Sequence, residues 1–216
     1  MITFNQVSKR FDGGYEALKQ INLSLGQGEM AFLTGNSGSG KTTLLKLIAM
    51  LELPSTGQIT INGQRLDQLK KRQVAQYRSS LGIALQTPHL LTDRSVFANV
   101  ALPLQVQGVA SKTIVKRVHA ALDMVGLLTR ENMLPNRLSG GEQQRVSIAR
   151  AIVHKPSILL ADEPTANLDA DLSMDVMKLF EQLNQAGVGV LVATHDLALI
   201  ARMKYRIVML KGGRVC

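Results

Sequence analysis

The segment from residue 35 to residue 42 has the composition of a phosphate-binding loop. It fits the pattern Gly-x-x-x-x-Gly-Lys-[Ser/Thr], whose glycines let backbone amides turn inward around phosphate oxygens at a helix start. Lys41 would neutralise the β and γ phosphates of a nucleotide, and Thr42 would bind Mg²⁺. The alternative is a plain glycine turn before a helix. The predicted nucleotide-binding residues are Gly35, Asn36, Ser37, Gly38, Ser39, Gly40, Lys41, Thr42 and Thr43.

Two adjacent carboxylates follow an apolar run later in the chain. The run from Ile158 to Ala161 predicts a buried strand, and Asp162 and Glu163 follow at its carboxyl end. Open α/β sheets bind their ligands at that edge. Asp162 would hold Mg²⁺ through water, and Glu163 would polarise the water that attacks a phosphate. Taken alone, the two carboxylates could equally be solvated side chains at a strand end. Together with the phosphate loop, they favour a role in ATP hydrolysis.

A third segment, residues 138 to 145, reads Leu-Ser-Gly-Gly-Glu-Gln-Gln-Arg. It resembles the signature of the ATP-binding cassette (ABC) ATPase family, which reads LSGGQ or LSGGE and stands shortly before the acid strand. Ser139 and Glu142 also fit a helix-capping box, which is compatible with that resemblance. The resemblance implies that Ser139, Gly140, Gly141 and Glu142 contact the γ-phosphate of ATP held by a second copy of the chain.

The resemblance covers essentially the whole chain and implies roles for isolated residues. Gln86 stands where the family's lid glutamine ends a strand, and His195 follows a strand as the family's switch histidine does. Phe11 occupies the place of the aromatic that stacks on adenine, with Tyr15 as a weaker candidate. The implied catalytic residues are Glu163, His195, Lys41 and Gln86, and the implied metal ligands are Thr42, Gln86 and Asp162.

Apolar patterns indicate the elements that position these groups. Continuous apolar runs alternate with helical stretches, which predicts a buried and mostly parallel sheet. Between residues 88 and 155 the pattern is helical, most clearly where Ile114, Val118 and Leu122 recur every four residues. The expected fold is α/β, with a RecA-like P-loop NTPase core, an N-terminal antiparallel β-subdomain and an inserted α-helical subdomain. We expect one ABC ATPase domain over residues 1–216, with residues 1–86 and 157–216 forming the nucleotide-binding core and residues 87–156 the helical subdomain.

Composition restricts the partners. The 216 residues are 45% hydrophobic, which suffices for one sizeable core. No apolar stretch reaches the ~18 residues that cross a bilayer, and the N-terminus lacks signal-peptide features, so a cytoplasmic chain is expected. The net charge of +9 favours an anionic partner. Aromatic residues make up only 4% of the chain and Trp is absent, so few side chains could stack on nucleic-acid bases. A membrane surface is therefore favoured over nucleic acid as the anionic partner.

The family resemblance also implies a working cycle. Two copies would form a homodimer around ATP and Mg²⁺, closing on binding and reopening after hydrolysis. The segment after Gln86 would grip a transmembrane subunit. Three stretches, most of all the Asp93-Arg94 pair, resemble family members that act in bacterial cell division. That implies a complex at the cytoplasmic face of the inner membrane that activates cell-wall hydrolases and contacts division proteins.

Three other functions remain open from the sequence. A transporter motor for lipoprotein release or macrolide export would share every catalytic residue, so only residues 87–104 discriminate. A DNA-maintenance ATPase would carry a long coiled coil between the phosphate loop and the signature. Here 97 residues without sustained heptads separate Lys41 from Ser139, which argues against it. A scaffold that binds ATP without hydrolysis conflicts with an intact catalytic set.

Overall fold

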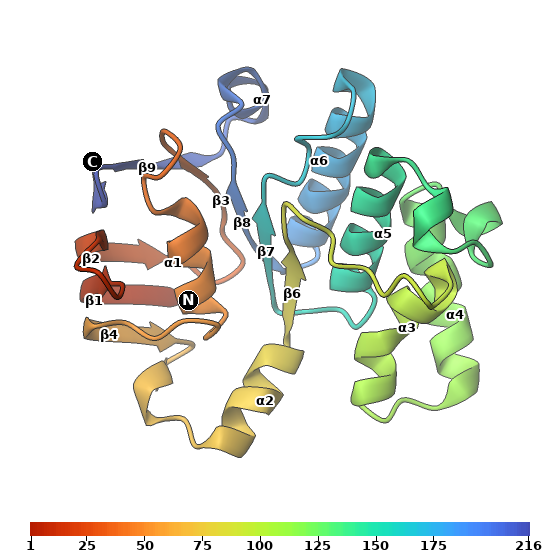
Figure 1. The fold of residues 1–216 in the computed structure, drawn as a ribbon, viewed down its shortest axis with the longest axis horizontal. Helices are drawn as coiled ribbons and strands as arrows, with labels where there is room; N and C mark the ends of the chain where they lie inside the picture. The colour runs from red at the N-terminus through yellow and green to blue at the C-terminus, as the bar shows by residue number, and fades with distance from the viewer.

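The computed structural model describes residues 1–216 and contains two β-sheets with helices packed around them (Figure 1). The first sheet has four antiparallel strands in the order β2-β1-β4-β5. Gly13 and Gly14 make the turn between β1 and β2, and both have positive φ, a conformation open to glycine. This sheet is the predicted antiparallel subdomain. Its strands are β1 (Ile2–Arg10), β2 (Glu16–Leu25), β4 (Thr56–Ile61) and β5 (Gln64–Arg65).

The second sheet has six strands in the order β10-β9-β3-β8-β7-β6. All its pairs are parallel except β9 with β10. Every residue of β3 and of β7 is buried, which explains the continuous apolar runs in the sequence. The strands are β3 (Met30–Thr34), β6 (Leu81–Ala84), β7 (Ile158–Asp162), β8 (Gly189–Ala193), β9 (Arg206–Lys211) and β10 (Arg214–Val215).

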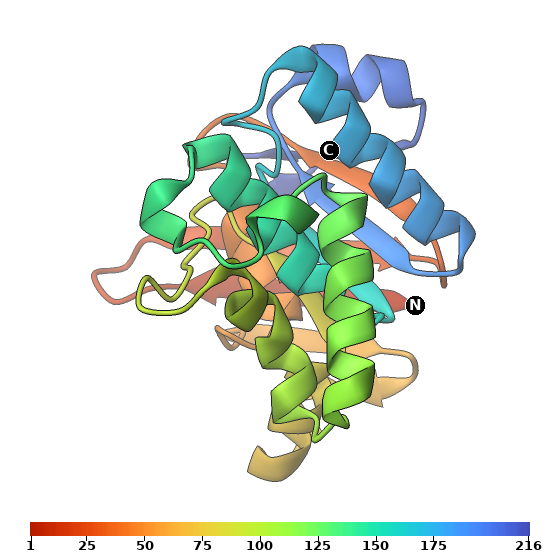
Figure 2. The ribbon, with the colours of Figure 1, turned by 90° about the vertical axis from the view of Figure 1, so that its right-hand side faces the viewer.

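Seven α-helices and three short 3-10 turns complete the chain. Figure 2 shows α3, α4 and α5 grouped together on one side of the sheet. In α4, Ile114, Val118 and Leu122 are buried, as the four-residue spacing predicted. The helices are α1 (Lys41–Ile48), α2 (Lys71–Ser79), α3 (Val96–Val106), α4 (Ser111–Met124), α5 (Gly140–Ile152), α6 (Ala170–Gln185) and α7 (Leu197–Met203), and the 3-10 turns are η1 (Leu66–Gln68), η2 (Leu128–Arg130) and η3 (Pro135–Arg137).

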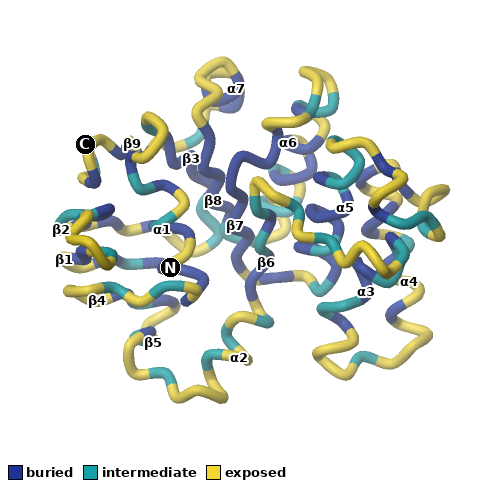
Figure 3. The backbone as a smooth tube through the Cα atoms, in the orientation of Figure 1, coloured by how far each residue is buried: buried dark blue, intermediate teal, exposed yellow.

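Two hydrophobic clusters hold the central sheet between its neighbours. Successive side chains of a strand point to opposite faces, so Phe32 joins a cluster of 31 buried residues and Leu33 a cluster of 25. The larger cluster includes buried residues of α3, α4, α5 and α6, and the smaller includes α1 and the first sheet. Figure 3 shows buried backbone through the central strands and exposed backbone along the outer loops. The carboxyl ends of the parallel strands are therefore held on a rigid base.

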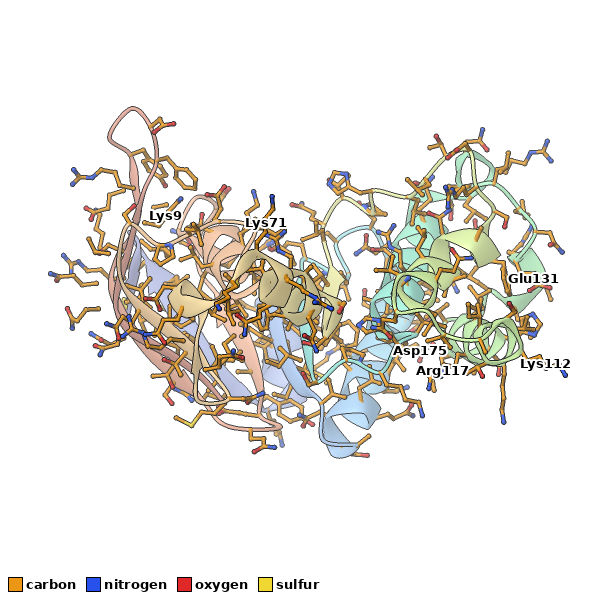
Figure 4. All side chains as sticks on the ribbon, turned by 90° about the horizontal axis from the view of Figure 1, so that it is seen from below. Lys9, Lys71, Lys112, Arg117, Glu131 and Asp175 are labelled. Carbon is orange, nitrogen blue, oxygen red and sulfur yellow. The ribbon has the colours of Figure 1, made fainter.

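None of the helices is both long and apolar enough to cross a lipid bilayer. The positive charge is spread over the molecule. Figure 4 labels Lys9 on β1 and Lys71 on α2 in one half of the molecule and Lys112 on α4 at the opposite end.

Candidate active site

A cavity of about 1180 Å³ lies at the carboxyl ends of the parallel strands. It brings together residues from distant parts of the sequence that were predicted to act on one nucleotide. Only four of its 20 lining residues are hydrophobic. The lining consists of Tyr15, residues 34–43, Gln86, Asp162, Glu163, His195, Leu197 and residues 209–212.

The loop between β3 and α1 leaves backbone amides free at a helix start. Gly40 is the N-cap of α1 with a φ of 107°, and no side chain caps the helix there. A Cβ on Gly35 would lie 2.1 Å from the Leu210 carbonyl oxygen, and one on Gly40 would lie 2.7 Å from the Ala17 carbonyl oxygen. Only glycine fits both positions. The first turn of α1 also lacks acidic residues, so its free N–H groups and dipole suit an anion.

Lys41 lies at the first position of α1 and is 9% exposed. Its Nζ donates hydrogen bonds to the carbonyl oxygens of Gly35 at 2.7 Å and Asn36 at 3.3 Å. No carboxylate lies within ion-pair distance of this ammonium group. The loop therefore holds a buried positive charge with only carbonyl partners, which favours a bound anion.

Thr42 and Asp162 meet across 120 residues of sequence. The Thr42 Oγ1 hydroxyl donates a 2.7 Å hydrogen bond to Asp162 Oδ2. Burial raises the pKa of Asp162 above its ordinary value, although the bond from Thr42 works in the opposite direction. A hydroxyl oxygen beside a carboxylate oxygen is a donor set that suits a hard cation such as Mg²⁺. Gln86 lines the same cavity.

Glu163 and His195 form a close pair on the cavity wall. His195 Nδ1 lies 2.7 Å from Glu163 Oε1. The Glu163 backbone has a φ of 47°, in the left-handed region that residues other than glycine rarely adopt. Its N–H donates to the carbonyl oxygen of Ala193 at 2.8 Å, which ties the end of β7 to the end of β8. Strained backbone is held here by two strands, as is common at functional sites.

The aromatic at the cavity is Tyr15, and Phe11 is absent from the lining. The Tyr15 hydroxyl donates to the carbonyl oxygen of Gly38 at 3.1 Å. Phe11 instead faces Lys9, whose Nζ lies 4.9 Å from the ring centroid. The assignment of adenine stacking to Phe11 stays a prediction. Tyr15, the weaker candidate from the sequence, is the aromatic residue that reaches the phosphate loop.

The signature residues lie outside this cavity, at the start of α5. Ser139 Oγ accepts a hydrogen bond from the Glu142 N–H at 3.2 Å, and Glu142 Oε2 accepts one from the Ser139 N–H at 2.8 Å. The capping box read from the sequence is thus present. Ser139 and Gly140 are exposed. A Cβ on Gly141 would lie 3.1 Å from the Asn167 carbonyl oxygen, so the helix start packs against the loop after β7. Within one chain, these groups do not share the phosphate-loop cavity.

Sequence reasoning missed part of the cavity wall. Leu197 and Met209 are 66% and 47% exposed and line the cavity with residues 210–212. Nothing local marks residues 209–212, because pairing of β9 with β3 brings them to the phosphate loop. Two other histidines make contacts outside the cavity. His119 contacts Glu131 at 2.8 Å, and His154 contacts the Leu81 carbonyl oxygen at 3.1 Å.

Comparison with known proteins supplies the family. The family described as "ABC transporter" matches residues 18–166, which is more than half of the chain. The chain belongs to the ABC transporter family.

Relatives and solved structures agree with this membership. The ABC chain is 52% identical over 215 residues to the cell division ATP-binding protein FtsE of Escherichia coli K12, covering 100% of this chain and 97% of that protein. It is also similar to the dimeric structure of a bacterial ABC transporter cassette, MJ0796, with a TM-score of 0.94, 36% identity and coverage of 100% and 96%. A post-hydrolysis dimer of the same cassette, bound to ADP and phosphate, matches equally well.

These findings confirm the predicted ABC ATPase fold, the ATPase enzyme class with ATP as its ligand, and the resemblance to cell-division members of the family. The individual residue roles remain predictions. The structure nevertheless places Lys41, Thr42, Gln86, Asp162, Glu163 and His195 around one cavity, as those roles require.

Proposed function

We propose that this chain is the ATP-hydrolysing subunit of an FtsE–FtsX-type complex of the bacterial inner membrane. In that complex, ATP-driven closure of the subunit pair activates cell-wall hydrolysis during division. The observation that carries the proposal is the 52% identity to FtsE over essentially the full length of both chains. The grouping of all four predicted catalytic side chains around one cavity supports it.

The residues around the phosphate loop suit a magnesium nucleotide. The free amides at the start of α1 and the Lys41 ammonium would hold the β and γ phosphates. The Thr42 hydroxyl and the Asp162 carboxylate, with Gln86 on the same cavity wall, would hold Mg²⁺. When bound, the cation neutralises charge that develops on the phosphate oxygens.

Glu163 and His195 would serve the hydrolytic step. Glu163 is positioned to accept a hydrogen bond from the attacking water and so to orient it toward the γ-phosphorus. His195 holds the carboxylate of Glu163 from one side and is itself 72% exposed, so it can move when a phosphate arrives. Lys41 and the loop amides stabilise the negative charge of the transition state, which is the main demand of phosphoryl transfer.

A second copy of the chain would complete each site. Ser139, Gly140, Gly141 and Glu142 lie at a helix start outside their own cavity, where Ser139 and Gly140 are exposed. The capping box occupies the N–H groups of Ser139 and Glu142, which leaves the amides of Gly140 and Gly141 available to a partner's nucleotide. The similar MJ0796 cassette is dimeric. We therefore expect two ATP molecules at the interface of a homodimer that closes on binding and reopens after hydrolysis.

The membrane partner would contact the helical subdomain. Residues 87–104 follow Gln86 directly, so a force on this segment reaches the active site through one residue. We expect a FtsX-like transmembrane subunit to grip it and to hold the chain at the cytoplasmic face of the inner membrane. Through that subunit the cycle would act on cell-wall hydrolase activators and other division proteins, without any contact to nucleic acid. The division into core and helical subdomain at residues 86/87 and 156/157 is part of this proposal.

Affinity purification tests this function. The Glu163→Gln chain should be trapped with ATP and purified from gently solubilised membranes of its source cell, with Lys41→Ala as the control that cannot hold ATP. We expect an FtsX-like membrane protein with wall-hydrolase components to accompany the trapped chain only. Recovery of a lipoprotein or macrolide permease instead would keep the enzyme class and reject the division role.

A further inference from the structure

The backbone around Gln86 is held by two side chains of α5, the helix that begins directly after Ser139. Gln144 Nε2 donates to the Leu85 carbonyl oxygen at 3.3 Å. Arg150 Nη1 donates to the His89 carbonyl oxygen at 3.0 Å, and its Nη2 donates to the Pro88 carbonyl oxygen. One contact lies before Gln86 in the chain and the others lie after it. Gln86 and Thr87 are exposed between them.

Hydrophobic packing does not explain why Gln144 and Arg150 occupy these positions. Gln144 is 1% exposed, and its Oε1 has no hydrogen-bond partner. Arg150 has no carboxylate within 4.0 Å, and burial lowers the pKa of its guanidinium below the ordinary value. Arg150 is partly buried, and a partly buried charge with only neutral partners is costly, so an apolar residue would fill the same space more favourably. The five donors of arginine, however, can span two successive carbonyl groups.

The next part of the segment is fixed to a second helix. Asn99 of α3 is fully buried and accepts a 2.8 Å hydrogen bond from the Leu91 N–H. Its Nδ2 donates to the carbonyl oxygens of Leu91 at 3.0 Å and Arg94 at 3.1 Å. Residues 91–94 are thus attached to α3, which packs against α5. Between Leu85 and Arg94, the backbone around Gln86 and Thr87 is therefore the part that these side-chain hydrogen bonds leave free.

The helix α5 joins these contacts to the signature. It has 13 residues and is therefore about 20 Å long, and its N-terminal amides follow Ser139. A helix buried on seven of its positions moves as a rigid element. We propose that Gln144 and Arg150 are positioning residues that fasten Gln86 to the signature helix. Displacement of one then displaces the other. In the homodimer this links the lid glutamine of one site to the signature that serves the other site. The inference rests on the proposed function for the roles of Gln86 and Ser139.

Fluorescence and kinetics together test the inference. The chain contains no Trp, so Thr87→Trp supplies a single fluorophore in the segment. We would combine it with Arg150→Ala, Arg150→Lys or Gln144→Met, and measure steady-state anisotropy in the full chain, and ATP affinity and kcat in the full complex. Arg117→Ala is the matched control, because Arg117 lies on α4 of the same subdomain (Figure 4) and its side chain makes no hydrogen bond or ion pair. Kinetics would also be measured without the Trp.

Arg150→Ala should lower the anisotropy and reduce kcat by roughly 3- to 30-fold, the range for residues that couple sites without touching ligand. ATP affinity should change by less than about twofold, since no nucleotide contact is lost. Arg150→Lys should recover part of both effects, because lysine can reach one carbonyl group. It also keeps the test valid if Arg150→Ala fails to fold. Gln144→Met should act in the same direction, and Arg117→Ala should change neither quantity.

Unchanged anisotropy in both Arg150 variants overturns the inference, and so does unchanged kcat in a variant whose anisotropy has fallen. A loss of ATP affinity equal to the loss of kcat overturns it as well, because that pattern indicates general damage to the nucleotide site. Failure of the proposed function is visible separately. If the unsubstituted complex does not hydrolyse ATP, the function is wrong, while the anisotropy still reports whether the segment is fastened to α5.

Discussion

The His195 imidazole and the Glu163 carboxylate lie 2.7 Å apart, Nδ1 to Oε1, at the ends of adjacent parallel strands β8 and β7. The pair is separated by 32 residues of sequence and is brought together by the sheet alone. Because only one Glu163 oxygen is engaged by His195, the other remains available to a water molecule. The orientation of the proposed water-activating group therefore depends on His195.

The first prediction concerns that dependence. His195→Ala should reduce kcat for ATP hydrolysis by about 10²-fold with ATP affinity nearly unchanged, since one preorganised partner of the reacting groups is lost. Phosphate release under saturating ATP measures it. His119→Ala is the control, because His119 lies on α4, contacts Glu131 and is absent from the cavity lining. Equal rates for the two variants would contradict a role for the pair.

The second prediction decides between two aromatic rings. Tyr15→Ala should weaken ATP binding by roughly tenfold, because an aromatic ring stacked on a base contributes about 1–3 kcal/mol and Tyr15 lines the cavity. Phe11→Ala should have the smaller effect, since that ring faces Lys9 and is absent from the lining. Titration with a fluorescent ATP analogue measures both. The reverse order would restore the assignment read from the sequence.

The third prediction concerns magnesium. Thr42→Val removes a hydroxyl that contacts Asp162 at 2.7 Å, and Asp162→Asn removes the carboxylate charge. Each should raise the Mg²⁺ concentration that gives half-maximal hydrolysis by about 10- to 100-fold. Thr113→Val, at an exposed position of α4, is the control. A Mg²⁺ dependence shared by all three variants and the parent chain would remove Thr42 and Asp162 from the metal site.

The fourth prediction uses the capping box at the signature. The backbone hydrogen bond from Ser139 lowers the pKa of Glu142 below its ordinary value of 4.5. A lowered carboxylate pKa adds stability above the ordinary pKa, and that stability is lost as the pH falls through the lowered value. Glu142→Gln keeps an oxygen acceptor but cannot ionise. Denaturant unfolding between about pH 6 and about pH 3 should therefore show a steeper loss of unfolding free energy in the parent chain than in this variant. Parallel curves would contradict the expectation.

Local sequence was sufficient for the elements whose signal is contiguous. The glycine pattern before Lys41 marks a loop that only glycine can form, and the apolar run before Asp162 marks a fully buried strand. Ser139 and Glu142 cap the start of a helix through their reciprocal hydrogen bonds. In each case the residues that make the structure are neighbours in sequence, so their spacing carries the information.

Tertiary pairing determined what the sequence could not show. Met209 reaches the cavity because β9 pairs with β3, and Phe11 turns toward Lys9 while Tyr15 reaches the loop, which depends on the conformation of one turn. The partners of Arg150 are carbonyl groups 61 and 62 residues away. Every residue has a backbone carbonyl group, so the residue types in a sequence do not indicate which carbonyl groups accept such hydrogen bonds.

The most direct test of the account compares the parent chain with Glu163→Gln in a single-turnover assay with Mg²⁺ and ATP, together with the sedimentation of both. Glu163→Gln should bind ATP normally and accumulate as a dimer, and its hydrolysis should be slower by roughly 10²- to 10⁴-fold, the range for loss of a positioned base. Near-normal hydrolysis, or an ATP-bound chain that stays monomeric, would contradict a composite site in which Glu163 activates water.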